Sequence, residues 1–129
     1  MISVDTNIIV RFLTRDDERQ YKKSYSIFNT QEIFIPDTVI LEAEWVLRYA
    51  YNFKPEDICN AFVSLFGLKN IHLSNPSFIA QAIEWHKQGM DFSDAMHLTH
   101  CQQHEKLYTF DKKFFSKAKN LTRCAVMLP

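Results

Sequence analysis

Two short apolar segments of the chain, Met1–Val4 and Leu107–Phe110, each run into an aspartate and are each followed by a helical pattern. Short apolar runs of this kind are typical of buried strands. Strand patterns alternate with helical patterns along the chain, which favours parallel strand pairing in a helix-covered α/β sheet. Because ligands of such sheets bind at the carboxyl ends of the strands, we expect Asp5 and Asp111 to share one end of the sheet.

The remaining elements are predicted from hydrophobic spacing and from turn signals. Further strands are predicted at residues 33–35, 71–73 and 122–127. Helices are predicted at residues 6–13, 17–29, 37–51, 55–67, 76–89, 91–104 and 112–118. Pro55 at a first helical position and Gly67 after a last one are typical helix boundaries.

Bulk properties restrict the class of protein. The 129 residues are expected to form a single domain over residues 1–129, and the formal net charge of zero leaves no broadly basic surface for binding nucleic acid. Three cysteines without framework spacing indicate a reducing, cytoplasmic location. No apolar run is long enough for a membrane span, and no leader segment is recognised. We therefore expect a soluble cytoplasmic protein that does not enter a membrane.

Two further acids lie inside helical patterns. The neighbours of Glu42 one turn away are apolar except for Thr38, so we expect its carboxylate to lack hydration. Glu44 has Arg48 four residues on, so a solvated or paired structural role is expected for it. Asp94 follows Asp91 by three residues, a spacing that also fits a helix cap with an acid in the first turn.

Each of these acids also has an ordinary structural explanation, because Asp5 and Asp111 both stand where a helix N-cap is expected. Taken together they suggest another role. Carboxylates gathered in an apolar setting repel one another unless they share a cation, and hard divalent ions prefer oxygen ligands. The sequence therefore suggests a metal site for chemistry on phosphate, with Asp5, Glu42, Asp94 and Asp111 as its catalytic and metal-binding residues.

Four short motifs resemble the PIN-domain ribonucleases, in particular the VapC toxins of bacterial toxin–antitoxin pairs. They are Asp5–Thr6–Asn7–Ile8, Leu41–Glu42 followed by Trp45–Val46–Leu47–Arg48, Asp91–Phe92–Ser93–Asp94–Ala95, and Leu107–Tyr108–Thr109–Phe110–Asp111. The resemblance covers essentially the whole chain.

The resemblance implies a three-layer α/β/α PIN-like domain with a mainly parallel sheet of four or five strands. It also implies endoribonuclease activity with Mg²⁺ or Mn²⁺, a homodimer, and inhibition by a small antitoxin protein. Asn7, Thr109 and Asp91 would support the four acids. The chain departs from many relatives at Lys112 and Lys113, where a further acid is common, which leaves a second metal position in question.

Other functions remain open on the residues alone. His97, His100, Cys101 and His104 have spacing that permits part of a zinc site. A phosphotransfer enzyme or receiver domain also uses strand-end carboxylates, although the paired acids of those families are absent here. A catalytically silent module that binds RNA or a partner protein is the non-enzymatic alternative.

Basic residues in segments near the expected site could hold the substrate. They are Arg11, Arg15, Arg48, Lys112 and Lys113.

Overall fold

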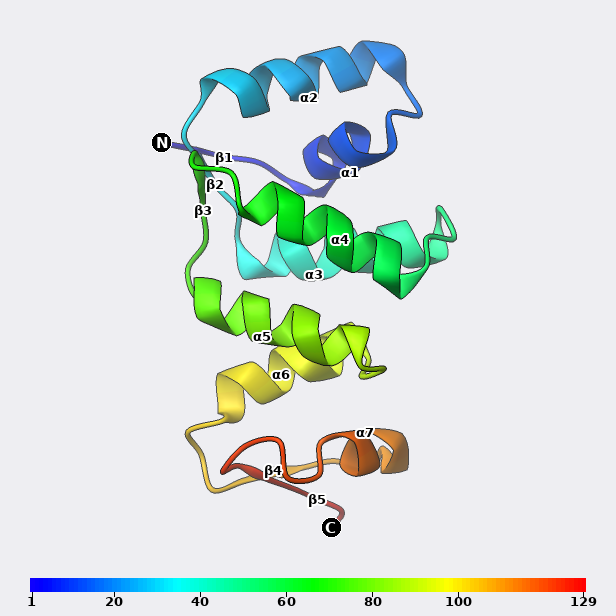
Figure 1. The fold of residues 1–129 in the computed structure, drawn as a ribbon, viewed down its shortest axis with the longest axis vertical. Coiled ribbons are helices and arrows are strands. Elements are labelled where there is room, and N and C mark those ends of the chain that lie inside the picture. Colours follow the sequence, from blue (N-terminus) through cyan, green and yellow to red (C-terminus); the bar gives the residue numbers. More distant parts are fainter. The chain divides into compact units, whose positions relative to one another are not determined.

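A computed structural model describes residues 1–129 and contains seven helices and five strands, with one or two helices between successive strands (Figure 1). The strands are β1 (Ile2–Ser3), β2 (Ile33–Phe34), β3 (Ile71–His72), β4 (Lys106–Tyr108) and β5 (Ala125–Met127). The helices are α1 (Thr6–Thr14), α2 (Glu18–Thr30), α3 (Asp37–Tyr49), α4 (Pro55–Phe66), α5 (Pro76–Lys87), α6 (Phe92–Cys101) and α7 (Lys112–Lys117). None of these helices combines the length and the apolar character needed to cross a bilayer.

The chain forms two compact units, Met1–Pro76 and Ser77–Pro129. In the first unit β1, β2 and β3 pair side by side in parallel, with Ile2 opposite Ile33 and Ile33 opposite Ile71. In the second unit β4 and β5 pair in parallel. The predicted α/β class with five strands and parallel pairing is confirmed, and the strands are divided into one sheet of three and one of two.

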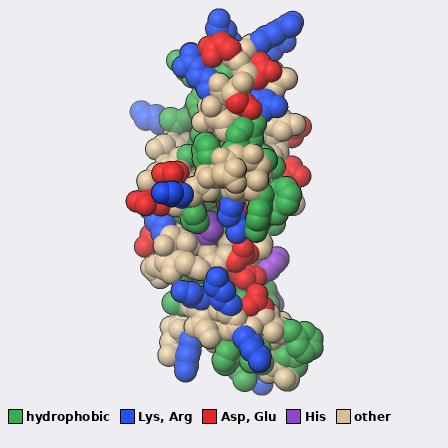
Figure 2. All heavy atoms as spheres, turned by 90° about the vertical axis from the view of Figure 1, so that its right-hand side faces the viewer, with side chains coloured by type: hydrophobic (Ala, Val, Ile, Leu, Met, Phe, Trp, Pro, Cys, Tyr) green, Lys and Arg blue, Asp and Glu red, His purple; other side chains and the backbone are tan.

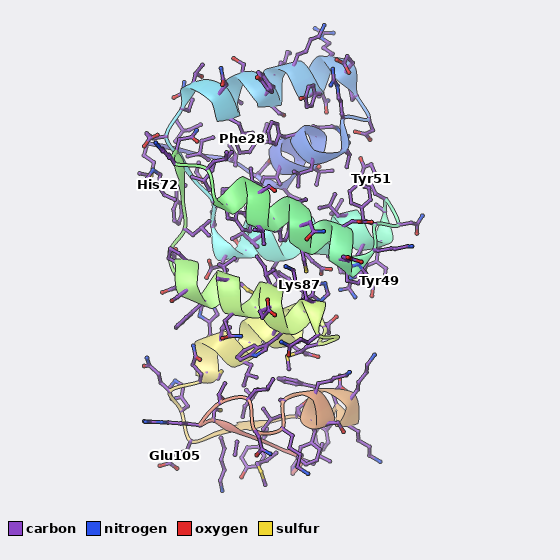
Figure 3. All side chains as sticks on the ribbon, in the orientation of Figure 1. Phe28, Tyr49, Tyr51, His72, Lys87 and Glu105 are labelled. Carbon is purple, nitrogen blue, oxygen red and sulfur yellow. The ribbon has the colours of Figure 1, made fainter.

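Aromatic side chains hold the helices of the first unit together. Helix α1 packs against α2 and α3. The ring of Phe12 on α1 lies 4.5 Å from the ring of Phe28 on α2, and the ring of Tyr21 on α2 stacks with Phe12 at a centroid distance of 6.2 Å. Figure 3 shows Phe28 pointing inward from α2. This packing fixes α1 against its neighbouring helices and so positions the residues that follow β1.

The second unit is built around α6, which packs on β4. The core of this unit includes Phe92, Leu98, Phe114 and Val126, all buried. Trp85 on α5 is also buried. Burying these side chains supplies most of the stabilisation, at roughly 25 cal/mol for each Å² of apolar surface removed from water.

Helix starts follow the capping signals of the sequence. The Asp17 carboxylate accepts the backbone N–H of Gln20 at 3.0 Å, and Pro55 occupies the first turn of α4. After α5 the backbone of Gly89 adopts a φ of 106°, which favours glycine over any residue with a Cβ. Strand ends were predicted less well. The strand predicted to reach Phe110 ends at Tyr108, because only Thr109 N–H continues the ladder, to Met127 O.

Candidate active site

Asp5 lies just beyond the carboxyl end of β1, at the N-cap position of α1. Its backbone is extended, as a cap requires, but its side chain accepts no capping hydrogen bond. The carboxylate is exposed. Asp5 therefore occupies the capping position without using its side-chain oxygens for capping, which leaves both oxygens available to a ligand.

Thr6 connects Asp5 to Glu42. The buried hydroxyl of Thr6 donates a hydrogen bond to Oε1 of Glu42, which joins the first turn of α1 to α3. This contact brings the Glu42 carboxylate to the residue that follows Asp5. Asn7, predicted as a supporting residue, is exposed beside them. The first unit thus brings two of the four candidate acids to one place.

Glu42 and Glu44 do not have the solvent exposure that the sequence predicted. Glu42 is exposed, whereas Glu44 is 1% exposed and forms an ion pair with Arg48, with Oε2 2.9 Å from Nε. The buried face of α3 carries Ile40, Ala43 and Leu47, at helical spacing from one another. Glu44 lies on that face and Glu42 does not. The predicted pairing of Glu44 with Arg48 is confirmed, but it is buried rather than solvated.

Asp91 caps α6 in the second unit. Its Oδ2 accepts the backbone N–H of Asp94 at 3.3 Å and the hydroxyl of Ser93 at 2.6 Å. This is the capping arrangement that the spacing of Asp91 and Asp94 allowed. The cap fixes the backbone of Asp94 in the first turn of α6.

The surroundings of Asp94 disfavour the charged form of its carboxyl group. Burial raises the pKa of its carboxyl group, and the nearby charges of Asp91 and Asp111 raise it further, while His97 acts in the opposite direction. The prediction that the acids repel one another in a poorly hydrated place holds for Asp94. It is wrong for Asp5, Glu42 and Asp111, which are exposed.

Asp111 caps α7 and is held in place by Thr109. The Oδ1 atom of Asp111 accepts the backbone N–H groups of Lys113 at 2.9 Å and Phe114 at 3.0 Å. The hydroxyl of Thr109 in turn accepts the backbone N–H of Asp111 at 3.0 Å. Thr109, predicted as a supporting residue, thus orders the loop that presents Asp111. The other carboxylate oxygen of Asp111 makes no capping bond.

Three of the five cations expected to hold substrate are already engaged with acids. Arg11 pairs with Asp16, Arg15 with Glu18, and Arg48 with Glu44; the first two are 3.1 and 3.0 Å apart. Lys112 and Lys113 are exposed beside Asp111. Figure 2 shows basic and acidic side chains interspersed over the face that it draws. The two lysines are therefore the better candidates for contact with a phosphate.

The acids fit a divalent ion in their chemistry. Carboxylate oxygens are the ligands that Mg²⁺ and Mn²⁺ prefer, and a bound cation would relieve the repulsion around Asp94. The structure brings the acids together as Asp5 with Glu42 in one unit, and as Asp94 with its acidic neighbours in the other. No group of three or more His, Cys, Asp or Glu side chains is arranged to hold a metal ion.

The residues of the zinc alternative make other contacts. The ring of His100 packs edge-on against Phe78 at 5.3 Å. Cys101 is one of three free cysteines. These contacts give the histidine-rich end of α6 a packing role.

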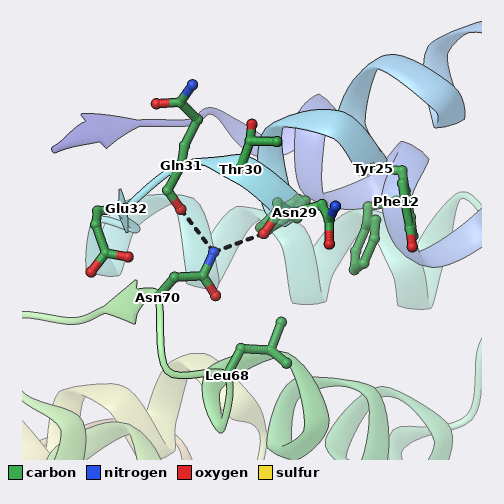
Figure 4. Close-up of a pocket in the computed structure, with 9 residues that line it drawn as sticks. Phe12, Tyr25, Asn29, Thr30, Gln31, Glu32, Leu68 and Asn70 are labelled. Carbon is green, nitrogen blue, oxygen red and sulfur yellow. Dashed lines mark hydrogen bonds between the residues drawn. The ribbon is translucent and has the colours of Figure 1, made fainter.

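A hollow of about 440 Å³ in the first unit is lined by neither Asp5 nor Glu42 (Figure 4). It is lined by Phe12, Tyr25, Phe28, Asn29, Thr30, Gln31, Glu32, Leu68 and Asn70. Glu32 and Asn70 directly precede β2 and β3, so the hollow lies at the amino ends of these parallel strands, whereas Asp5 follows a carboxyl end. Asn70 Nδ2 donates to Phe28 O and to Gln31 O, both at 2.7 Å, and thereby closes the end of α2. The hollow is therefore not the predicted site.

A parallel α/β fold with carboxylates after its strands belongs to the class of proteins that bind ligands at the carboxyl ends of a sheet. The family model of the PIN domain matches residues 2–120. The chain therefore belongs to the PIN-domain family, which consists generally of nucleases that act on RNA and typically use divalent metal ions. A search of curated proteins found no significant match.

Proposed function

We propose that the protein is a metal-dependent endoribonuclease that hydrolyses phosphodiester bonds in RNA, using Asp5, Glu42, Asp94 and Asp111. The observation that carries this proposal is the match of the PIN family model to residues 2–120, in a chain whose Asp5 and Asp111 follow the carboxyl ends of parallel strands. A carboxyl group held among other carboxylates costs stability, and such arrangements are concentrated at functional sites.

The chain's own groups have separate roles in this proposal. Asp5 and Asp94 are the most direct ligands, since neither uses its carboxylate as a helix cap. Glu42, oriented by the Thr6 hydroxyl, and Asp111, oriented by Thr109, hold and align the attacking water. Asp91 fixes the backbone of Asp94. Lys112 and Lys113 attract the phosphates of the substrate.

The proposed cofactor is Mg²⁺, with Mn²⁺ as the alternative, held by Asp5, Asp94, Glu42 and Asp111. Such an ion, when bound, lowers the pKa of a coordinated water and neutralises negative charge on phosphoryl oxygens. Since Lys112 and Lys113 replace a further acid, we propose a single ion.

We further propose that the protein is the toxin of a VapBC-type toxin–antitoxin module, acting in the cytoplasm as a homodimer and inhibited by a small antitoxin protein. The order of the four motifs along the chain supports this assignment, and we propose that residues 1–129 form a single domain. A short reading frame directly upstream that encodes a DNA-binding protein would add support. Copurification of that protein with the nuclease would test the partnership directly.

Incubation of purified protein with total RNA and Mg²⁺, followed by sequencing of the new RNA ends, tests the nuclease function. We expect cleavage at a restricted set of positions, which ceases with EDTA and in the Asp5→Asn variant. Asp57→Asn, at an exposed acid in the first turn of α4, is the matched control and should cleave like the wild type.

RNA that is bound and left intact with either metal would contradict the proposal. That result would favour the catalytically silent module instead. Release of phosphate from small phosphomonoesters, with no strand cleavage, would indicate a phosphatase.

A further inference from the structure

The hollow in the first unit has the size of a ligand site and no cationic side chain in its lining. Its volume of about 440 Å³ lies within the range of sites that bind small organic molecules, about 300–1,000 Å³. Aromatic rings and Leu68 form its apolar part, and carboxamides, Thr30 and Glu32 form its polar part. No lysine, arginine or histidine lines it. The hollow therefore offers nothing that would attract an anion.

Two features give the hollow a negative potential. Helix α2 ends in its wall at Thr30, and the last turn of α2 has no basic residue to offset the partial negative charge of a helix C-terminus. Glu32 adds a carboxylate whose side chain is 59% exposed. Its Oε1 atom lies 3.1 Å from Nε2 of His72 (Figure 3), while Oε2 has no partner in the chain. A positively charged ligand is therefore favoured here.

Asn70 presents a fixed hydrogen-bond acceptor to this ligand. Both hydrogens of its amide nitrogen are used, in the bonds to the carbonyl oxygens of Phe28 and Gln31, so the two ends of the amide cannot exchange. Figure 4 shows the amide oxygen turned away from these carbonyls, toward the side on which Leu68 lies. This oxygen accepts no hydrogen bond from the chain, so it calls for a ligand that donates one.

The aromatic end of the hollow is suited to a cation. Tyr25 is 50% exposed, and the ring of Phe12 lies 6.4 Å from it. The adjoining ring of Tyr21, 6.0 Å from Tyr25, already has the guanidinium of Arg15 at 4.4 Å from its centre. The face of an aromatic ring attracts a cation that lies within about 6 Å of its centre. Tyr25 therefore provides a second position for positive charge.

These two positions lie at opposite ends of the hollow. Figure 4 shows Glu32 and Asn70 at one end and Phe12 and Tyr25 at the other. Tyr25 precedes the last residue of α2 by five residues, which is about 7.5 Å along the helix axis, and Glu32 lies beyond that end. The hollow therefore suits an elongated ligand with a positive charge at each end.

We propose that the hollow binds an aliphatic diamine or polyamine. One ammonium group donates to Oδ1 of Asn70 and pairs with Glu32. The methylene chain lies on Leu68 and Phe12, and the second ammonium group lies against the ring of Tyr25. None of the candidate acids lines the hollow, so this inference does not depend on the proposed nuclease function.

Titration calorimetry with 1,5-diaminopentane, on the full chain in metal-free buffer, tests this inference. We expect saturable binding of one molecule per chain. The neutral isostere 1,5-pentanediol carries hydroxyl groups in place of the ammonium groups and should show no measurable binding.

Two variants alter exposed side chains at the two ends of the hollow. Tyr25→Leu removes the ring but keeps apolar bulk, and it should weaken binding about fivefold, the upper value for an exposed cation–π contact. Glu32→Gln removes the charge with little change in shape and should weaken binding by about the same factor. Because each end holds its own ammonium group, the double variant should lose the product of the two factors, about 25-fold.

Three matched substitutions should leave the affinity for the diamine unchanged. Tyr25→Phe keeps the face of the ring. Glu56→Gln removes an exposed acid from the first turn of α4, outside the lining. Asp94→Asn alters the candidate active site and shows whether the diamine binds there instead.

A wild type without saturable binding would overturn the inference, and so would equal affinity for the diol. Loss of binding in Asp94→Asn, with wild-type affinity in both Tyr25→Leu and Glu32→Gln, would assign the diamine to the candidate acids and would also overturn it. A chain that binds the diamine through Tyr25 and Glu32 but cleaves no RNA would support the inference and remove only the proposed nuclease function.

Discussion

The acids of the two units are held in different ways. In Met1–Pro76, Asp5 and Glu42 are exposed, and Glu42 is satisfied by the hydroxyl of Thr6. In Ser77–Pro129, Asp94 is half-buried among other carboxylates, and its pKa is raised. The comparison teaches that burial and neighbouring charge draw attention to Asp94, whereas Asp5 and Glu42 enter the proposed site through their sequence motifs.

The largest expected effect is that of Asp94→Asn. Loss of a residue that only supports a metal ligand costs up to about 100-fold in activity, so loss of a direct ligand should lower RNA cleavage by at least that factor. The metal-free variant should nevertheless melt at a higher temperature than the wild type at neutral pH, because the change removes a carboxylate whose charged form is disfavoured. Cleavage assays and thermal melts in EDTA measure the two effects.

The pH dependence of this stabilisation follows from its sign. A raised pKa means that the folded state binds more protons than the unfolded state, so wild-type stability falls as pH rises through the interval from the ordinary pKa to the raised one. The increase in stability caused by Asp94→Asn should therefore vanish at pH values below that interval. A variant that is less stable than the wild type at neutral pH would show that Asp94 has a structural role.

Glu42 and Glu44 give the next largest contrast. Glu44→Ala breaks a buried ion pair and should lower the free energy of unfolding by about 3 kcal/mol, at the low end of such losses because Arg48 reaches solvent. Glu42→Gln should leave the denaturant midpoint nearly unchanged and abolish cleavage. Urea unfolding combined with RNA cleavage separates the two. A destabilised Glu42→Gln with normal activity would reverse the assignment.

Asp111 combines a cap with a proposed site function, and two substitutions separate them. Asp111→Ala should cost about 1 kcal/mol of stability through the lost cap of α7, whereas Asp111→Asn keeps a capping oxygen and should cost little. Both should lower cleavage, since neither retains the negative charge. Full activity in Asp111→Asn would limit Asp111 to its capping role.

The smallest effect concerns Asp16, which lies outside the site. The Tyr51 hydroxyl, which lies just beyond α3 (Figure 3), donates to Asp16 Oδ2 at 2.6 Å. This bond is the first cause of the lowered pKa of Asp16, and Thr14 and Arg11 add to it. A lowered pKa gives stability that is present above the ordinary pKa and lost as pH falls through the lowered one. Tyr51→Phe should therefore reduce the melting temperature slightly at neutral pH and not at all in strong acid. If Tyr51→Phe and the wild type melted at the same temperature at neutral pH as well as in strong acid, the hydrogen bond would contribute nothing to stability.

The sequence predicted the helices well because their ends carry local signals. Asp17, Pro55 and Asp91 mark helix starts through their own backbone contacts, which need no tertiary information. The strand ends were less certain, since strands of two or three residues hold few ladder bonds and depend on a partner elsewhere in the chain.

The surroundings of the site residues were predicted less well. The apolar neighbours of Glu42 suggested that it is buried. In the structure, however, the buried face of α3 is formed by Ile40, Ala43 and Leu47, and Glu44 lies on that face. The helical spacing of these three apolar residues was the sequence signal for the burial of Glu44. The contact of Arg11 with Tyr51 joins residues far apart in sequence and could not be predicted from spacing.

Titration calorimetry with Mn²⁺ tests most directly whether these carboxylates serve one shared ion. The wild type, Asp5→Asn and Asp94→Asn, which alter one acid in each unit, are titrated under identical conditions. The account predicts that the wild type binds a single ion and that either substitution alone removes this binding. Retention of wild-type Mn²⁺ binding in one variant and its loss in the other would contradict the account.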